Sequence, residues 1–152
     1  MTPPLVLSAH ELHREYPMGG STVHALRGVS LDVATGDYVA IVGPSGCGKS
    51  SLLNLLGAID RPDRGSVAIN GARVDELSDR DATRFRLLHI GLVFQRFYLL
   101  PALTAAENVE LPMSEAGMRR ADRRARSREL LAYVGLSARV DHRPSQLSGG
   151  EQ

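Results

Sequence analysis

The chain has 152 residues, with 18 Lys and Arg against 17 Asp and Glu and a formal net charge of +1. That length suits about one domain, and the charge balance excludes a strong overall field toward nucleic acid or anionic lipid. The single cysteine excludes an intramolecular disulfide and fits a reducing cytoplasm. No run reaches the roughly eighteen apolar residues of a membrane span, and the first residues do not resemble a signal peptide.

The N-terminal third predicts a β-rich layer. A first strand begins at residues 5–8 and runs toward Tyr16, a Pro and Gly turn follows at 17–20, and short strands are expected at 23–26 and 29–33. Tyr16 leaves two interpretations open. Its ring could stack on an adenine face, or it could be a half-buried tyrosine at a strand end.

Residues 43–50, GPSGCGKS, match the phosphate-binding pattern G-x-x-x-x-G-K-[ST]. Residues 38–42 before it predict a buried parallel strand, and residues 51–56 after it predict an apolar helix, so an ordinary glycine turn is disfavoured. Backbone N–H groups of this loop should converge on phosphate oxygens. Lys49 should reach the β- and γ-phosphates and the Ser50 hydroxyl should bind Mg²⁺. The predicted nucleotide-binding residues are Gly43, Ser45, Gly46, Cys47, Gly48, Lys49, Ser50 and Ser51.

The middle of the chain predicts a hairpin, a helix and a second buried strand. A turn cluster at 60–65 precedes a strand at 66–69 and an Asn-Gly turn, and Ser78 should cap a helix through about Arg86. Residues 90–94 predict a short buried strand that ends at Gln95. An amide at the carboxyl end of such a strand belongs in the ligand crevice of an α/β sheet, although Gln95 could simply cap the strand.

From Phe97 onward the pattern becomes helical. Thr104 should cap a helix that Pro112 ends, and a longer helix should run from about Met118 to Val134 and close at Gly135. This helix carries six arginines between positions 119 and 128, with Asp122 and Arg126 spaced for an i,i+4 pair. Interspersed alanines and acids favour a solvated helix face over a nucleic-acid or lipid contact.

The last residues place Ser148, Gly149 and Gly150 where a helix would open. Bare N–H groups at such a start suit a phosphate, and the alternative is a flexible tail.

Together, GPSGCGKS, VFQ and LSGGEQ resemble the ATP-binding subunit of ABC transporters, and residues 93–101 and 104–109 are most similar to the macrolide-exporter and lipoprotein-release branch. The resemblance implies an α/β fold: a P-loop (RecA-like) core, an N-terminal antiparallel β-subdomain and a helical signature-motif subdomain. We expect the β-subdomain and P-loop core in residues 1–95 and the helical subdomain in residues 96–152.

The resemblance also implies roles. Tyr16 would stack on adenine, Lys49 and Gln95 would serve catalysis of ATP hydrolysis, and Ser50 and Gln95 would hold Mg²⁺. Ser148, Gly149 and Gly150 would close over the ATP of a second ATP-binding subunit in a head-to-tail dimer. A transmembrane permease would be the other partner, at the cytoplasmic face of the inner membrane, with no nucleic acid expected.

The family pattern continues past LSGGEQ into an apolar strand ending Asp-Glu and a switch histidine, which have no match here. Val74-Asp75-Glu76 precedes the signature and cannot supply the general base. We therefore expect the N-terminal portion of a longer ATPase, inactive alone. The alternatives are a soluble ABC-type ATPase acting on nucleic acid or the ribosome, disfavoured by the short interval from Phe94 to Leu147, and a nucleotide-binding regulator that never hydrolyses.

Overall fold

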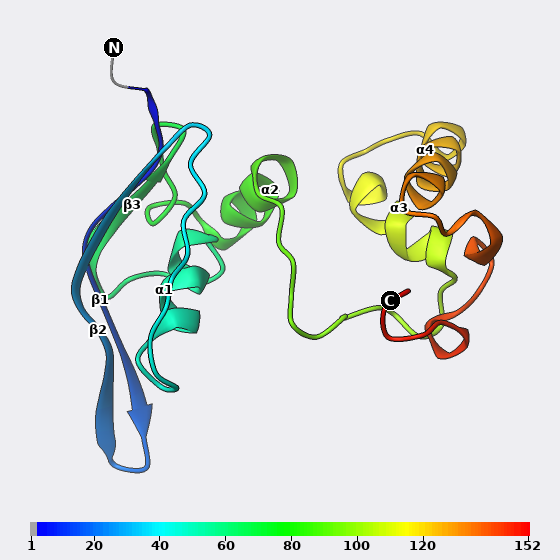
Figure 1. The fold of residues 1–152 in the computed structure, drawn as a ribbon. Coiled ribbons are helices and arrows are strands. Elements are labelled where there is room, and N and C mark those ends of the chain that lie inside the picture. Colours follow the sequence, from blue (N-terminus) through cyan, green and yellow to red (C-terminus); the bar gives the residue numbers. More distant parts are fainter. Residues whose placement is uncertain (1–2) are drawn as a thin grey trace. The chain divides into compact units, whose positions relative to one another are not determined.

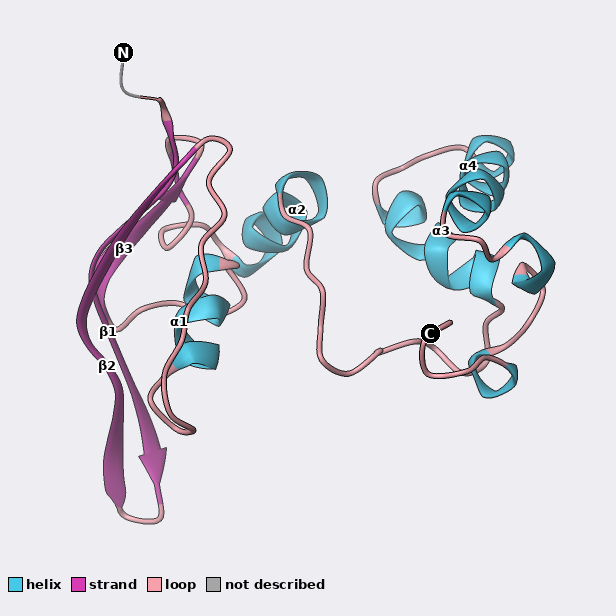
Figure 2. Ribbon diagram, viewed as in Figure 1, coloured by secondary structure: helices cyan, strands magenta, loops and turns pink. Residues whose placement is uncertain are grey.

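A computed structural model describes residues 3–152, and the chain divides into two compact units at the boundary between Arg86 and Leu87. Figures 1 and 2 show a first unit built on a sheet and a second built from helices. The chain thus contains both helices and strands, as the predicted α/β fold with a β-subdomain and a helical subdomain requires.

The first unit holds one antiparallel sheet with strand order β2-β1-β3-β4. Its strands are β1 (Leu5–Met18), β2 (Ser21–Ala34), β3 (Arg64–Ile69) and β4 (Ala72–Arg73). The two short strands expected at 23–26 and 29–33 are one strand instead. Gly28, with φ +81°, is absorbed as an irregularity between the pairs Leu12↔Val29 and His13↔Arg27, because β1 offers a continuous partner on both sides of it.

Helix α1 (Lys49–Leu56) contacts β1 and β2 and closes the core of this unit. Leu12 from β1, Val67 from β3 and Leu55 from α1 are almost fully buried. Helix α2 (Asp79–His89) follows, and its first turn is capped as predicted because the Asp81 N–H donates to Ser78 Oγ at 3.2 Å. Apolar burial between one sheet face and α1 therefore holds the phosphate loop in place.

Two predicted strands are not formed. Residues 38–42 and 90–94 are irregular chain, and the side chains of Tyr38 and Val93 are 97% and 102% exposed. A strand exists only where a neighbour accepts its backbone hydrogen bonds. Among residues 3–152, every strand pair is antiparallel and none includes these two segments, so the prediction of buried parallel strands is wrong for this chain.

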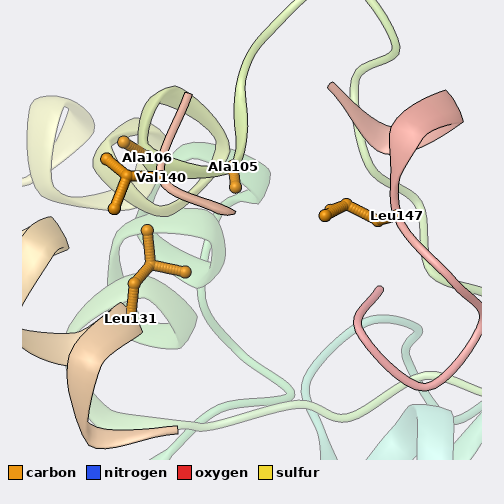
Figure 3. Packing of buried hydrophobic residues seen from close by; sticks show 5 residues of the cluster. All are labelled: Ala105, Ala106, Leu131, Val140 and Leu147. Atoms are coloured by element: carbon orange, nitrogen blue, oxygen red, sulfur yellow. The ribbon is translucent and has the colours of Figure 1, made fainter. Parts of the chain in front are cut away.

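The second unit packs α3 (Ala105–Glu115) against α4 (Arg120–Tyr133), followed by the short helices η1 (Ser137–Arg139) and η2 (Pro144–Gln146). Figure 3 shows its buried cluster, formed by Ala105, Ala106, Leu131, Val140 and Leu147. The first free N–H groups of α3 are satisfied by the segment after α4, with Ala105 N donating to His142 O at 2.7 Å and Ala106 N to Val140 O at 3.0 Å. This pairing ties the chain before the signature motif to α3.

Thr104 caps α3 with a complete capping box, in which Glu107 N donates to Thr104 Oγ1 and Thr104 N donates to Glu107 Oε2. The prediction that Pro112 ends this helix is wrong, since the helix continues to Glu115. Proline removes only its own N–H, and Ala116 N still donates to Pro112 O at 3.0 Å.

The arginine-rich helix α4 is a largely solvated face, as predicted: of the six arginines between positions 119 and 128, only Arg123 is partly buried. The predicted pair of Asp122 with Arg126 is wrong, because Asp122 accepts from Arg119 at 2.8 Å and Arg126 pairs with Glu129 at 2.7 Å. Both observed pairs have i,i+3 spacing, which is an equally close neighbour on a helix surface. Gly135, at φ +79°, follows the helix in the left-handed conformation expected of a C-terminal cap.

Candidate functional site

The start of α1 exposes a set of unsatisfied backbone donors. Its N-cap is Gly48, which makes no side-chain capping bond, and the first intrahelical bond runs from Leu52 N to Gly48 O at 2.9 Å. The N–H groups of Lys49, Ser50 and Ser51 therefore have no partner within the helix. No acidic residue lies in the first turn, so the positive end of the helix dipole meets no countercharge there.

Lys49 directs its amine back into the loop. Its Nζ donates to Gly43 O at 2.9 Å, to Pro44 O at 2.7 Å and to Cys47 Sγ at 3.7 Å. These three acceptors use all three ammonium donors, and all are uncharged side-chain or backbone groups. Within residues 3–152 Lys49 forms no ion pair. The loop thus presents a positive charge together with free N–H groups.

Close packing requires glycine at position 48 of the loop, whereas an added Cβ at Gly43 would meet only a side chain. A Cβ on Gly48 would lie 2.3 Å from Ala25 O of β2, and Gly48 also has φ +93°. A Cβ on Gly43 would lie 2.7 Å from the sulfur of Cys47. Gly46, by contrast, needs only its positive φ and has open space around it. Cys47 is exposed at the rim of the loop, beside Ser45.

The residues predicted to hold Mg²⁺ fit that role by their chemistry. Ser50 is exposed in the first turn of α1, and its hydroxyl makes no hydrogen bond within the part of the chain that the structure describes. Gln95 lies in an exposed bend of the second unit, and its amide is likewise not engaged. Between residues 3 and 152 no group of three or more His, Cys, Asp or Glu residues forms a metal site.

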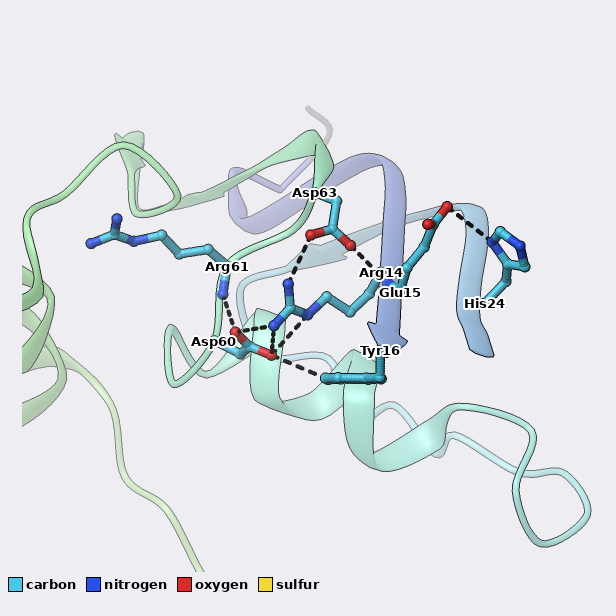
Figure 4. Close-up of polar contacts among 7 residues, drawn as sticks. All are labelled: Arg14, Glu15, Tyr16, His24, Asp60, Arg61 and Asp63. Atoms are coloured by element: carbon cyan, nitrogen blue, oxygen red, sulfur yellow. Dashed lines mark hydrogen bonds and ion pairs between the residues drawn. The ribbon is translucent and has the colours of Figure 1, made fainter. Parts of the chain in front are cut away.

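Tyr16 lies near the end of β1 and is half-buried. Its hydroxyl donates to Asp60 Oδ2 at 3.1 Å, and the Arg14 guanidinium carbon lies 4.8 Å from the centre of its ring. Figure 4 shows these side chains converging above α1. Asp60 and Arg14 therefore hold the tyrosine in place, one at its hydroxyl and the other at its ring.

The signature residues Ser148, Gly149 and Gly150 form an exposed turn at the end of the second unit. Ser148 N donates to Glu151 Oε2 at 2.8 Å, and Arg139 Nε donates to Glu151 Oε1 at 2.9 Å. These bonds, the Ser148 N–H first, lower the pKa of Glu151 from 4.5 to about 2. The carboxylate therefore anchors the turn and stays charged at any physiological pH.

Gly149 and Gly150 have no structural need to be glycine. Neither has a positive φ, and a Cβ added to either would meet nothing within 4 Å. This contrasts with Gly48, where both constraints apply. The absence of side chains leaves an open surface at the signature turn, onto which another molecule can approach the backbone closely.

Sequence reasoning missed two ion pairs: that of Arg14 with Asp60 in the first unit and that of Arg139 with Glu151 in the second. Arg14 could have been noted, because it lies two residues before Tyr16 and so on the same face of the strand. Its partner Asp60 lies 46 residues away, and no local pattern connects the two.

The family model "ABC transporter" matches residues 26–152. An uncharacterized ABC transporter ATP-binding protein of Thermotoga maritima is 51% identical over 147 residues, which cover 97% of this chain and 63% of that protein. A lipoprotein-releasing system ATP-binding protein LolD of Alcanivorax borkumensis is 50% identical over 147 residues, covering 97% and 64%. A macrolide export ATP-binding/permease protein MacB of Burkholderia pseudomallei is 50% identical over 152 residues, covering 100% and 23%.

Among solved structures, the dimeric post-hydrolysis state of the ATP-binding cassette MJ0796 bound to ADP and Pi matches with a TM-score of 0.88 and 40% identity. The match covers 95% of this chain and 64% of that one. The chain thus spans between about a quarter and two thirds of the length of the proteins it resembles. No helix within residues 3–152 is long and apolar enough to cross a membrane.

Proposed function

This chain belongs to the ABC transporter family, and we propose that it is the ATP-binding part of a transporter that powers export through an inner-membrane permease. The proposed reaction is hydrolysis of ATP to ADP and phosphate, coupled to dimer closure. The relatives named for macrolide export and lipoprotein release support this branch. None of the relatives described above is named for action on nucleic acid or the ribosome, so that alternative is not favoured.

One observation carries the proposal: α1 begins with free N–H groups from Lys49 onward, and the ammonium of the same lysine rests on neutral acceptors. Charge-assisted hydrogen bonds to phosphate are shorter and about twice as strong as neutral ones. A triphosphate would therefore draw Lys49 off Gly43 O and Pro44 O and give the helix dipole its missing countercharge.

Within the bound state, each loop residue has a separate task. The N–H groups of Ser45, Gly46, Cys47 and Gly48 would bind phosphate oxygens along with those of Lys49, Ser50 and Ser51. The Ser50 hydroxyl and the Gln95 amide would orient Mg²⁺, which neutralises charge that develops on the phosphates. Lys49 would hold the γ-phosphate in line for attack by water, so that catalysis rests on positioning.

The signature turn would act on a second subunit. Open space at Gly149 and Gly150 supports close approach of a partner's nucleotide to their N–H groups, with the Ser148 hydroxyl as a further donor. Solved neighbours that are cassette dimers support a head-to-tail pair, in which each subunit completes the other's site. ATP would then stabilise the closed dimer more than ADP and phosphate do, and this difference would drive the change between the closed and open dimer.

We place the functional boundary at Gln95, with the nucleotide core in residues 1–95 and the partner-facing helical part in residues 96–152. The cassette relatives are longer than this chain, and we assign to their additional length both the general base and the strands that would pair with residues 38–42 and 90–94. The 152 residues alone would then not turn over ATP. The complete protein would lie on the cytoplasmic face of the membrane beside its permease.

The test compares this chain with a form extended to the length of its cassette relatives. We expect the extended form to hydrolyse Mg-ATP, Lys49→Ala to abolish hydrolysis, and the 152-residue chain to show none. If the extended form binds ATP but stays inert even with a permease supplied, the regulator interpretation replaces the transporter.

A second pair of variants tests the dimer. Gly149→Ala and Gly150→Ala should leave the unfolding midpoint unchanged, because a Cβ meets nothing at either position. Both should reduce ATP-dependent dimerisation, measured by light scattering. Dimerisation at the wild-type level in both variants would refute a role for this turn.

A further inference from the structure

Arg14, Tyr16, Asp60 and Asp63 form a polar network between β1 and the turn after α1 (Figure 4). The Arg14 guanidinium binds Asp60 with two parallel bonds, from Nε to Oδ2 and from Nη2 to Oδ1, each 2.9 Å long. Its third bond, from Nη1, reaches Asp63 Oδ1 at 2.8 Å. The Arg14 and Asp60 side chains are only 22% and 28% exposed. A bidentate pair of this kind fixes geometry as well as adding energy.

This network holds Tyr16 at two points. Asp60 Oδ2 accepts the tyrosine hydroxyl at 3.1 Å, while Arg14 covers the ring at 4.8 Å from its centre. A cation over an aromatic face is attracted by the negative potential of the ring. Because Arg14 occupies one face of the ring, a further stacking partner would have to use the opposite face.

Tyr16 and the phosphate loop both meet the same strand, β2. Gly48 packs against Ala25 of β2, and the residues on either side of Ala25 pair with Glu15 and Arg14 of β1. Tyr16 itself pairs with Val23, two residues along β2 from Ala25, and neighbouring strands are about 4.8 Å apart. A nucleotide held by its phosphates in the loop would extend its base along this strand toward Tyr16.

We propose that Arg14 and Asp60 are positioning residues for the nucleotide base: they lock the Tyr16 ring so that its free face receives the adenine. The proposal rests on the proposed function, because it assumes a nucleotide in the phosphate loop. Arg14 and Asp60 should therefore strengthen the binding of ATP through its base and have no effect on the binding of its phosphates. Pre-organising the ring lowers the entropy lost when the base stacks on it.

The rival explanation is that the Arg14–Asp60 pair merely ties β1 to the turn after α1. Asp63 offers a matched control, because it also joins this strand to the same turn. It accepts from Arg14 Nη1 and from Glu15 N at 2.6 Å, yet has no contact with Tyr16. A purely structural tie would make Asp63→Asn and Asp60→Asn equivalent.

The experiment measures binding of Mg-ATP and of magnesium tripolyphosphate to the extended form by isothermal titration calorimetry. Tripolyphosphate has the phosphates without the base. We expect the wild type to bind ATP more tightly than tripolyphosphate, and Tyr16→Ala to lose roughly tenfold or more for ATP alone, as expected for a lost base–aromatic stack. Tyr16→Phe and Asp60→Asn should weaken ATP about three- to tenfold, a modest share of that stacking effect, and leave tripolyphosphate within about twofold.

Asp63→Asn should keep the wild-type ratio of the two affinities. The proposal is overturned if Asp60→Asn lowers both affinities equally, if it changes neither, or if Asp63→Asn alters the ratio as much. It is also overturned if the wild type binds tripolyphosphate as tightly as ATP, an outcome that leaves the phosphate site intact. Binding of neither ligand by the wild type would instead refute the proposed function, and this inference with it.

Discussion

Substitution of Gly48 by alanine tests the packing of the phosphate loop on the sheet. The new Cβ would lie 2.3 Å from Ala25 O and 3.2 Å from Leu26 Cδ2, and the residue has φ +93°. The left-handed conformation costs an L-residue about 1–2 kcal/mol. Because the obstacle is a backbone oxygen that cannot rotate away, overpacking adds about 1–3 kcal/mol. Gly46→Ala is the matched control, since it has φ +80° but nothing within 4 Å.

The assay is thermal unfolding of both variants without nucleotide, followed by circular dichroism. One kcal/mol corresponds to about 2–4 °C in a protein of this size. Gly48→Ala should therefore unfold roughly 2–12 °C below Gly46→Ala, which is the effect of the clash alone. Equal midpoints would refute the reasoning, because they would mean that the loop shifts off β2 without cost.

Three further predictions concern single side chains. Glu151→Gln removes the carboxylate that anchors the signature turn. The pKa of Glu151 is about 2 in the folded state against an ordinary 4.5. The stabilisation from this carboxylate is therefore complete above about pH 4.5 and is lost as the pH falls toward 2. The difference in midpoint between wild type and Glu151→Gln should shrink over that interval, and a constant difference would contradict it. Thr104→Ala should cost about 1 kcal/mol in urea unfolding and Thr104→Ser much less, because serine keeps the capping box; equal losses would argue against the cap. A bulky thiol reagent on exposed Cys47 should block Mg-ATP binding, and bound Mg-ATP should slow the modification; full modification with normal binding would disprove this.

The phosphate loop and the Thr104 cap could be predicted because their interactions are local. Lys49 contacts carbonyls five and six residues away, and Thr104 pairs with Glu107 three residues on. For the cap, the residue types and their spacing already contain the partners; the carbonyl contacts of Lys49 are equally local but were not predicted. The same holds for Gly135, whose φ follows from its place after the last turn of α4.

Predictions that required distant partners were less successful. The apolar runs at 38–42 and 90–94 have the composition of buried strands, but composition does not supply the neighbouring strand that would accept their hydrogen bonds. The missing N–H of Pro112, considered alone, predicts the end of a helix. In the structure, the residues after it keep their own bonds, and the packing of α3 on α4 holds the helix together.

By itself, the sequence determined which residue types this protein can use: a loop rich in glycine before a helix, a lysine and a serine beside it, and a second glycine turn after a helical region. These are short-range features, set by which residues can adopt a given turn and donate to a phosphate. Only the tertiary structure decided that Arg14 and Asp60 hold Tyr16, that Gly48 must fit against β2, and that Gly149 and Gly150 stand open. Such contacts join segments far apart in the chain, and they exist only after apolar burial between the sheet and α1, and between α3 and α4, has brought those segments together.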